Sequence, residues 1–214
     1  MANKDDNPTF KEAMISPDAG GFMTAMDIEI KTLISLDVFD LVPRPTEKVI
    51  SGVWAFKRKR YPNGSVRKLK ARYCARGFEQ QQGIDYFETF APVVMWLTVR
   101  LLLIMSLLLD LQTKQIDYTA AFVHAPIDCT VYVEMPRGFA VEGHVWKLKK
   151  SLYGLAQSPR NLFLHTKNQL INKLGFSATD ADPCLFISNE VICLIYVDDA
   201  LLFYKDAASI HRLT

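Results

Sequence analysis

Two adjacent carboxylates interrupt a long apolar segment in the last part of this 214-residue chain. Asp198 and Asp199 follow the apolar run 191–197, and the sequence is apolar again over 200–204. Two apolar arms around a two-residue acidic tip predict a β-hairpin that carries both carboxylates out of the sheet. An unpaired buried carboxylate is costly, so such a tip favours solvent, a cation or a basic partner. Aspartate is also common in turns for structural reasons alone, so the pair by itself does not establish a site.

A third carboxylate, Asp117, closes a short strand predicted over residues 112–117. Carboxylate oxygens are the ligands that Mg²⁺ prefers, and two such ions about 3.5–4 Å apart can hold the attacking and the leaving oxygen of a phosphoryl displacement. If the strand that ends at Asp117 lies beside the hairpin of Asp198 and Asp199, the three side chains form a two-metal site. That adjacency is the assumption on which the prediction depends.

The positive charge of the chain is concentrated in one short segment. The formal net charge is only +2, but residues 57–78 carry nine basic side chains and no acidic one. A strand predicted over 53–61, the turn 62–65 and a returning strand over 66–75 make this segment a β-hairpin. A solvated basic hairpin would need no partner. Nine cations without an anion nevertheless favour a phosphate-rich polyanion as its ligand.

Composition narrows the class of protein. Half of the residues are hydrophobic, which is enough for one large domain or two small lobes. The four cysteines contain no C-x-x-C pair and have no histidines at zinc-site spacing, so we expect reduced thiols in the core. The polar start predicts no secretory signal, and the apolar run Leu101–Leu109 is too short to span a bilayer. We interpret that run as a buried helix, and we expect an intracellular protein with no membrane partner.

The order of the predicted elements favours an α+β fold over a doubly wound parallel sheet, because helices are mixed with hairpins. The first 20 residues are polar and contain prolines and a glycine, so we expect a tether there. Helices are predicted over residues 22–36, 95–110 and 159–174, and further strands over 131–135 and 145–148.

Three motifs resemble those of reverse transcriptases from copia-type retrotransposons. The string Tyr196-Val197-Asp198-Asp199 is similar to the tyrosine-x-Asp-Asp motif of that family. Ile116–Phe122 resembles the family's first metal-ligand motif, in which an aromatic residue follows the Asp by five positions. Ser151–Arg160 resembles the copia-type signature around a Leu-Tyr-Gly-Leu core, with Ala156 in place of the usual lysine. Further matches follow in the family's order, so the resemblance covers residues from about 22 to 205.

The resemblance implies an RNA-directed DNA polymerase. Such an enzyme transfers nucleotides from dNTPs onto a primer paired with an RNA or DNA template, and it uses two Mg²⁺ ions, or Mn²⁺ in their place. The implied fold is that of a right-hand polymerase, with fingers and a mainly antiparallel palm sheet packed against helices, and without thumb or ribonuclease H. The tether 1–20 would precede a fingers-like region 21–110, with the basic hairpin 53–76, and a palm-like region 111–214. Other polyprotein segments are expected partners, and the cytoplasm, including virus-like particles, is the expected location.

The resemblance also gives roles to individual residues. Asp117, Asp198 and Asp199 match the catalytic metal ligands. Phe122 matches an aromatic residue under the incoming sugar, where a ring would clash with a ribose 2′-hydroxyl, although residue type alone would favour a core Phe. Two cations of the basic hairpin match those that grip the triphosphate. The predicted substrate-binding residues are Lys70, Arg72, Tyr118, Phe122, Tyr153, Gly154, Gln157 and Tyr196.

Three other classes of function compete with this interpretation, and the weakest of them, a plain interaction protein, leaves the ordered motifs unexplained. A catalytically inactive nucleic-acid-binding remnant of a retroelement would keep the basic hairpin but lack turnover. A phosphatase of the haloacid-dehalogenase type, or a receiver-type phosphoacceptor domain, places an acidic pair at the end of a parallel strand that leads into a helix. The residues after Asp199 are apolar and strand-like, which favours a hairpin and therefore the polymerase.

Overall fold

The computed structural model describes residues 4–211 and residue 213. The chain forms two compact units. Unit 1 consists of the residues up to Phe87 together with Pro126–Ser158, and unit 2 of Glu88–Ala125 together with the residues from Pro159 onward. Each unit has helices and mainly antiparallel sheets, so the α+β class is confirmed.

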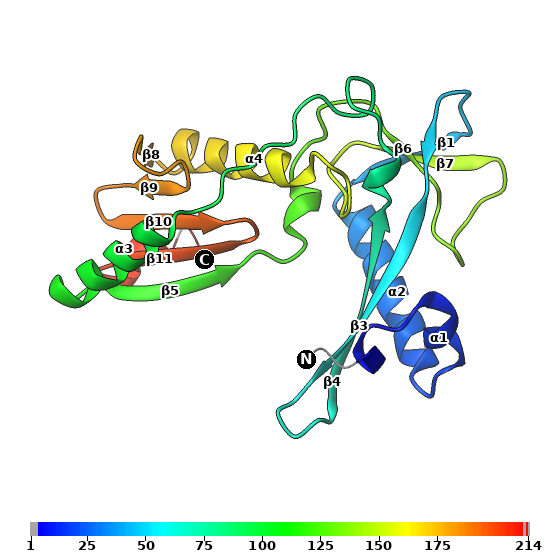
Figure 1. Cartoon of the computed structure of the whole chain (residues 1–214), viewed down its shortest axis with the longest axis horizontal. Helices are drawn as coiled ribbons and strands as arrows, with labels where there is room; N and C mark the ends of the chain where they lie inside the picture. Colours follow the sequence, from blue (N-terminus) through cyan, green and yellow to red (C-terminus); the bar gives the residue numbers. More distant parts are fainter. Residues whose placement is uncertain (1–3, 212, 214) are drawn as a thin grey trace. The chain divides into compact units, whose positions relative to one another are not determined.

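Unit 1 is built on a two-stranded antiparallel ribbon of β3 (Gly52–Arg60) and β4 (Val66–Ala75), which confirms the predicted basic hairpin (Figure 1). Helix α2 (Ala19–Ser35), predicted over 22–36, runs along β4. Gly21 lies on the side of α2 next to β4, where an added Cβ atom would lie 2.4 Å from Cδ1 of Leu69 and would displace the end of that side chain.

Aromatic side chains fill the space between the ribbon and α2. Trp54, Phe56 and Tyr73 point inward from the ribbon and are almost fully buried. The ring of Phe22, on α2, meets Phe56 edge-on at 5.0 Å between centroids, and Tyr73 meets Trp146 at 5.4 Å. Such edge-to-face pairs stabilise a core beyond their buried area.

A four-stranded sheet completes unit 1. Its order is β1 (Phe39–Pro43), β7 (His144–Leu148), β6 (Tyr132–Val133) and β2 (Val49–Ile50). All its pairings are antiparallel except β2–β6, which is parallel. A 3₁₀ turn, Gly77–Glu79, follows β4.

The N-terminal segment, expected as a tether, is anchored to the ribbon. It contains a 3₁₀ turn (Lys4–Asp6) and helix α1 (Phe10–Ile15), which begins with a capping box between Thr9 and Glu12. Acidic residues of the segment pair with the ribbon, since Arg58 donates to Asp18 and Arg60 to Asp6, each at 2.6 Å. Two of the acidic side chains that make this segment polar form ion pairs with ribbon arginines. A polar composition alone therefore did not predict that the segment is fixed to the ribbon.

Unit 2 is a five-stranded antiparallel sheet with a helix on each face (Figure 1). Helix α4 (Ser158–Asn172) packs on one face through Leu170, and α3 (Trp96–Leu108) packs on the other through Leu102. Two 3₁₀ turns, Ala121–His124 and Ala207–Ile210, complete the unit. The strand order is β5 (Gln112–Asp117), β11 (Asp199–Tyr204), β10 (Val191–Tyr196), β9 (Leu185–Ile187) and β8 (Ser177–Ala178).

The expectation that the run Leu101–Leu109 is buried is wrong. Leu101 is 54% exposed, Leu107 84% and Leu108 78%. A run that is apolar all round gives no indication of which side faces the core, and only a narrow stripe around Leu102 packs on the sheet. Within the described residues, every helix is too short or too polar to cross a bilayer.

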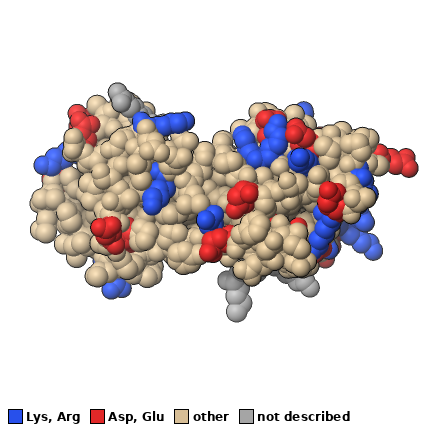
Figure 2. Space-filling view, turned by 90° about the horizontal axis from the view of Figure 1, so that it is seen from above, with Lys and Arg blue, Asp and Glu red and all other residues tan. Residues whose placement is uncertain are grey.

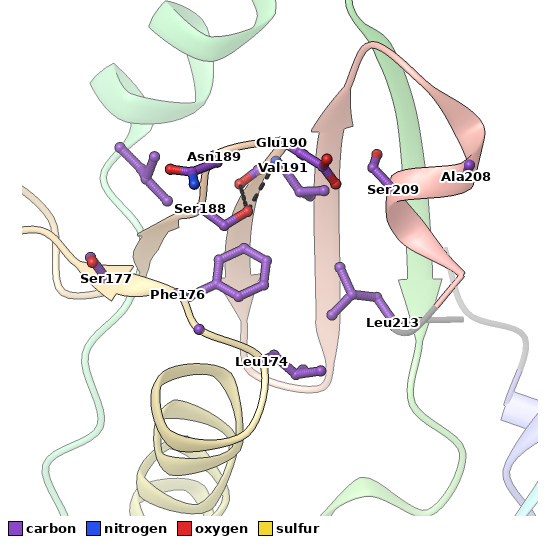
Figure 3. A pocket seen from close by; sticks show the side chains of 12 residues that line it. Leu174, Phe176, Ser177, Ser188, Asn189, Glu190, Val191, Ala208, Ser209 and Leu213 are labelled. Carbon is purple, nitrogen blue, oxygen red and sulfur yellow. Dashed lines mark hydrogen bonds between the residues drawn. The ribbon is translucent and has the colours of Figure 1, made fainter.

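Surface charge and hollows do not by themselves mark a site. On the face seen in Figure 2, charged side chains are scattered between broad uncharged areas. A hollow of about 690 Å³ lies among Phe176, Ser188, Val191 and Ser209 (Figure 3). It lies by the start of β10, whereas the predicted carboxylates follow the other end of that strand.

Candidate active site

The predicted acidic hairpin is present, but its turn lies one residue earlier than expected, so Asp199 is the first residue of β11 and is paired within the sheet. In the β10–β11 register the last pair is Tyr196 with Asp199, so Val197 and Asp198 make a two-residue turn. Val197 has φ +57°, a left-handed conformation that is rare for a β-branched residue. Such strain costs about 1–3 kcal/mol and is found mostly where a site requires a particular backbone shape.

The strand register places the three predicted carboxylates at the same end of the unit 2 sheet. Strand β11 pairs with β5, and Asp199 lies directly opposite Asp117 in that register. The chain just beyond the strands is joined as well, because the amide of Tyr118 donates to the carbonyl oxygen of Asp198 at 3.1 Å. The adjacency that the sequence could only assume is therefore present.

A neighbour that the sequence analysis missed orients one of these carboxylates. The side-chain amide of Gln115 donates to Oδ1 of Asp199 at 3.2 Å. Side chains alternate along a strand, so Gln115 lies on the same face of β5 as Asp117, two positions away. That two-residue spacing was the only signal in the sequence, and it becomes informative only once the pairing with β11 is known.

The donor chemistry of this strand end fits a hard divalent cation. Asp117 is exposed, Asp198 and Asp199 are partly exposed, and all three offer carboxylate oxygens, which Mg²⁺ prefers. Within the part of the chain that is described, no three His, Cys, Asp or Glu side chains are drawn together tightly enough to form a metal cluster. The strand register therefore places the three carboxylates at one end of the sheet, while their side chains do not form a closed ligand cluster.

An apolar hollow of about 520 Å³ adjoins the carboxylates. Trp96, Tyr196 and Leu194 contribute to its walls, and Gln115 and Asp199 line it as well. Tyr196, predicted to bind substrate, is 53% exposed beside the turn. The hollow thus gives the acidic tip a wall of aromatic and aliphatic groups.

The two other predicted residues of unit 2 follow β5 directly. Tyr118 is partly exposed next to Asp117. Phe122 lies in the 3₁₀ turn Ala121–His124 and packs in part against the cluster of Ala121, Ala125 and Leu162. Phe122 is therefore held by packing while part of its ring stays accessible.

In unit 1, the predicted phosphate-binding cations lie on the outward face of the ribbon. Lys70 lies directly opposite Lys57, and Lys68 directly opposite Lys59. Like charges opposite each other across a strand pair are destabilising, so this face gains from a bound polyanion. Burial, together with the nearby charges of Arg72 and Lys59, lowers the pKa of Lys70.

Arg72 is held by the loop that carries two other predicted residues. Its guanidinium group lies 4.5 Å from the ring centroid of Tyr153, a cation–π contact. The carbonyl of Tyr153 accepts from the amide of Ala75 at 2.8 Å, which ties the loop to the end of β4. Gly154, at φ +88°, passes so close that a Cβ atom would lie 2.1 Å from the carbonyl oxygen of Ala75. Only glycine suits both the angle and the approach.

A carboxylate that the sequence analysis missed faces the same cations. Glu29, on α2, accepts a hydrogen bond from the amide of Tyr73 at 3.3 Å. Its burial raises the pKa of the carboxyl group, while that hydrogen bond and the charges of Arg72 and Lys70 act in the opposite direction. No sequence motif marks Glu29, because its position depends on how α2 packs along β4.

Gln157, predicted to bind substrate, is fully buried. Its Nε2 donates to the carbonyl of Asp85 at 3.0 Å, and its Oε1 accepts from Gln80 at 3.0 Å. The side chain holds two loops of unit 1 together and presents no exposed group to a substrate. The predicted residues are thus gathered in two sets: Asp117, Tyr118, Phe122, Tyr196, Asp198 and Asp199 in unit 2, and Lys70, Arg72, Tyr153, Gly154 and Gln157 in unit 1.

The family described as reverse transcriptase (RNA-dependent DNA polymerase) matches residues 36–214 of this sequence. The chain belongs to the reverse transcriptase family. Its relatives are Pol polyproteins of copia-type retrotransposons. It is 36% identical over 96% of its length to the retrovirus-related Pol polyprotein from transposon TNT 1-94 of Nicotiana tabacum, and 35% identical over 88% to that from transposon RE1 of Arabidopsis thaliana. The chain spans only 16% and 13% of those two polyproteins.

Solved structures of reverse transcriptases show a more distant likeness. A foamy viral protease–reverse transcriptase in complex with double-stranded DNA is 14% identical to this chain, with a TM-score of 0.41 over 86% of it and 26% of the viral chain. The native prototype foamy virus protease–reverse transcriptase is 15% identical, also with a TM-score of 0.41, over 93% of this chain and 22% of the viral one.

Proposed function

We propose that this chain forms the fingers and palm of an RNA-directed DNA polymerase, which transfers nucleotides from dNTPs onto a primer paired with an RNA or DNA template. The observation that carries the proposal is the register of β5 with β11, which sets Asp199 opposite Asp117 and puts Asp198 at the adjoining turn.

The fingers-like region was expected over 21–110 and the palm-like region over 111–214, whereas the compact units exchange segments across that boundary, because 88–110 belongs to unit 2 and 126–158 to unit 1. The proposed fingers-like function therefore rests on the ribbon of unit 1, and the palm-like function on the strands of unit 2 that carry the carboxylates.

Asp117, Asp198 and Asp199 would hold two Mg²⁺ ions, or Mn²⁺ in their place. Such ions lower the pKa of a bound hydroxyl and neutralise charge on the transferred phosphoryl group. The chain's own contribution is to keep three carboxylates at one exposed strand end, with Gln115 orienting Asp199. A rigid sheet under this cluster supports the fixed geometry that phosphoryl transfer needs.

The ribbon of unit 1 would bind the phosphates of nucleotide and template. Arg72 suits this role because its guanidinium is always charged and forms paired hydrogen bonds with phosphate oxygens. Its stacking on Tyr153 limits the conformations that must be ordered when a triphosphate binds. Lys70 adds a second charge on the same outward face.

Phe122 would discriminate between sugars. Its backbone follows Asp117 within unit 2, and its ring is held by the cluster around Leu162. A ring fixed under the incoming sugar leaves no room for a 2′-hydroxyl, so deoxynucleotides are favoured. Phe122→Val should allow ribonucleotide incorporation while DNA synthesis continues.

Primer extension with Mg²⁺ tests the proposal. The chain should extend a primed RNA or DNA template, alone or joined to further segments of a Pol polyprotein. Asp117→Asn and Asp198→Asn should abolish extension, whereas Asp180→Asn, at an exposed position of unit 2, should leave it unchanged. Extension by either of the first two variants at the parent's rate would sink the metal assignment. A parent that retards nucleic acid on a gel but extends nothing, even with those segments, would support the inactive-remnant alternative.

A further inference from the structure

The β3–β4 ribbon provides carboxylate partners for some of its cations and not for others. Arg58 lies two positions beyond the buried Phe56 and therefore shares the inward face of β3. It donates to Asp18 at 2.6 Å, and Arg60, at the end of the strand, donates to Asp6 at the same distance. Each of these arginines thus has a carboxylate of the N-terminal segment as its partner.

The outward face of the ribbon carries lysines that lie opposite one another. Lys59 is paired with Lys68, and Lys57 with Lys70; all are exposed except Lys70, which is partly buried. We call these two pairs the lysine rungs. Among the residues that the structure describes, no ion pair involves a lysine of the rungs. Like charges directly opposite each other are destabilising, so the rungs weaken the free ribbon and become favourable when an anion lies between them.

We propose that the lysine rungs are a track for one unpaired nucleic-acid strand, with a phosphate group of the strand at each rung. The inference rests on the proposed function in taking that strand to be the template. Burial, followed by the charges of Arg72 and Lys59, lowers the pKa of Lys70. The cations of this face thus disfavour one another's charge, and a phosphate between them would remove that repulsion.

The dimensions of the rungs fit a single strand. The rungs lie two residues apart, which is about 7 Å along an antiparallel strand, and the two strands of the ribbon are about 5 Å apart. A flexible single strand can bring successive phosphates to successive rungs. A duplex holds its phosphates on both sides of grooves about 6–12 Å wide, so most of them would lie beyond so narrow a strip.

The row of cations leads to the proposed nucleotide-binding residue. The next position of β4 on the outward face is that of Arg72, opposite Ala55. A basic track beside an aromatic side chain is the usual form of a single-strand site, and Tyr153, which stacks on Arg72, is such a side chain. A template strand on the rungs would therefore run toward the residue that holds the incoming nucleotide.

Fluorescence anisotropy with a labelled oligothymidylate, which forms no duplex, tests the track. Binding to the full chain is measured at a series of salt concentrations in the presence of a chelator. For a single strand each phosphate contact contributes about −0.7 to the slope of log K against log salt concentration, so the two rungs predict a contribution of about −1.4.

Removal of one rung should weaken binding several-fold at low salt and make the slope shallower by about 0.7. The variant combines Lys59→Gln with Lys68→Gln, whereas Lys59→Arg with Lys68→Arg keeps both charges and should bind like the parent. The matched control combines Lys11→Gln with Lys147→Gln, two exposed lysines elsewhere in unit 1, and should keep the parent's slope. Equal losses in the two Gln variants would overturn the track, and so would tighter binding of a blunt duplex than of the single strand.

A protection experiment on the unchanged parent keeps the test independent of any folding defect. Bound oligothymidylate should protect Lys57, Lys59 and Lys68 from an amine-reactive reagent, as measured by mass spectrometry. Lys11 and Lys147 should stay reactive. If the oligonucleotide left the reactivity of all five lysines unchanged, or protected all five equally, the strand would not lie on the rungs.

These measurements use neither Mg²⁺ nor dNTPs, so their outcome is separate from that of primer extension. A chain that binds the strand as described but extends no primer would sustain the track and contradict the proposed polymerase activity. A chain that extends primers while its strand binding does not depend on the rungs would do the opposite.

Discussion

The side-chain amide of Gln115 donates a hydrogen bond to Asp199, the carboxylate that lies directly opposite Asp117. Groups that hydrogen-bond to a metal ligand orient it, and their mutation typically lowers metal affinity or activity by about 10- to 100-fold. Gln115→Leu should therefore raise the Mg²⁺ concentration needed for half-maximal primer extension by several-fold. Gln112→Leu, at the opposite end of the same strand, is the matched control. An unchanged Mg²⁺ requirement would show that Asp199 needs no such support.

Glu29 should make unit 1 less stable as the pH rises. Burial raises the pKa of its carboxyl group, so the folded state binds a proton more tightly than the unfolded chain does. Stability then falls with pH from the ordinary glutamate range up through the raised value. Glu29→Gln removes this dependence and keeps an acceptor oxygen for the amide of Tyr73.

Denaturant unfolding at a series of pH values measures the effect. Relative to the parent, Glu29→Gln should be more stable at pH 7, and the difference should shrink as the pH falls through the glutamate range. Asp27→Asn, at an exposed position of the same helix, controls for loss of charge on α2. If Glu29→Gln increased the free energy of unfolding equally at every pH, Glu29 would not be the cause of the loss of stability with rising pH.

Tyr153 should act on nucleotide binding through Arg72. A cation–π contact at a partly exposed site contributes about 0.5–1 kcal/mol, which corresponds to roughly a two- to fivefold change in an equilibrium constant. Tyr153→Leu should raise KM for dNTPs by that factor with little change in kcat, because the chemical step uses the carboxylates of unit 2. Tyr153→Phe keeps the aromatic face and should behave like the parent. If the Phe variant is as impaired as the Leu variant, the hydroxyl group matters and the stacking does not.

The acidic hairpin and the basic ribbon could be predicted from the sequence because each is formed by one continuous segment. Each has two strand-like arms around a turn signal. The first turn contains Gly64 as expected, whereas the second lies at Val197–Asp198, one residue before the expected acidic tip. Asp117 and Asp199 are brought together by a pairing between distant strands, which metal-ligand chemistry and the family motifs suggested but no local pattern could establish. Interior strands of two or three residues, such as β6 and β9, are too short to show a periodicity.

The residues that the sequence analysis missed depend on packing. Glu29 is significant because α2 passes along the edge of β4, and Gln115 because β11 lies beside β5. The burial of Gln157 likewise follows from two loops that close over it. The all-apolar character of α3 predicted a buried helix, and the side that is left open is visible only in the folded unit. In each case the missing information is the identity of a neighbour far away in the sequence.

Gly154 should be indispensable for the loop that supports Arg72. At φ +88° any side chain is strained, and a Cβ atom would lie 2.1 Å from the carbonyl oxygen of Ala75, a backbone atom that cannot move alone. Gly154→Ala should therefore lower the free energy of unfolding by about 1–3 kcal/mol and raise KM for dNTPs. Gly20→Ala is the matched control, because Gly20 lies in α2 with no atom within 4 Å of its Cβ position. That change should stabilise the chain by up to about 1 kcal/mol through helix propensity. Equal and small effects of the two substitutions in denaturant unfolding would mean that the loop does not need its left-handed turn.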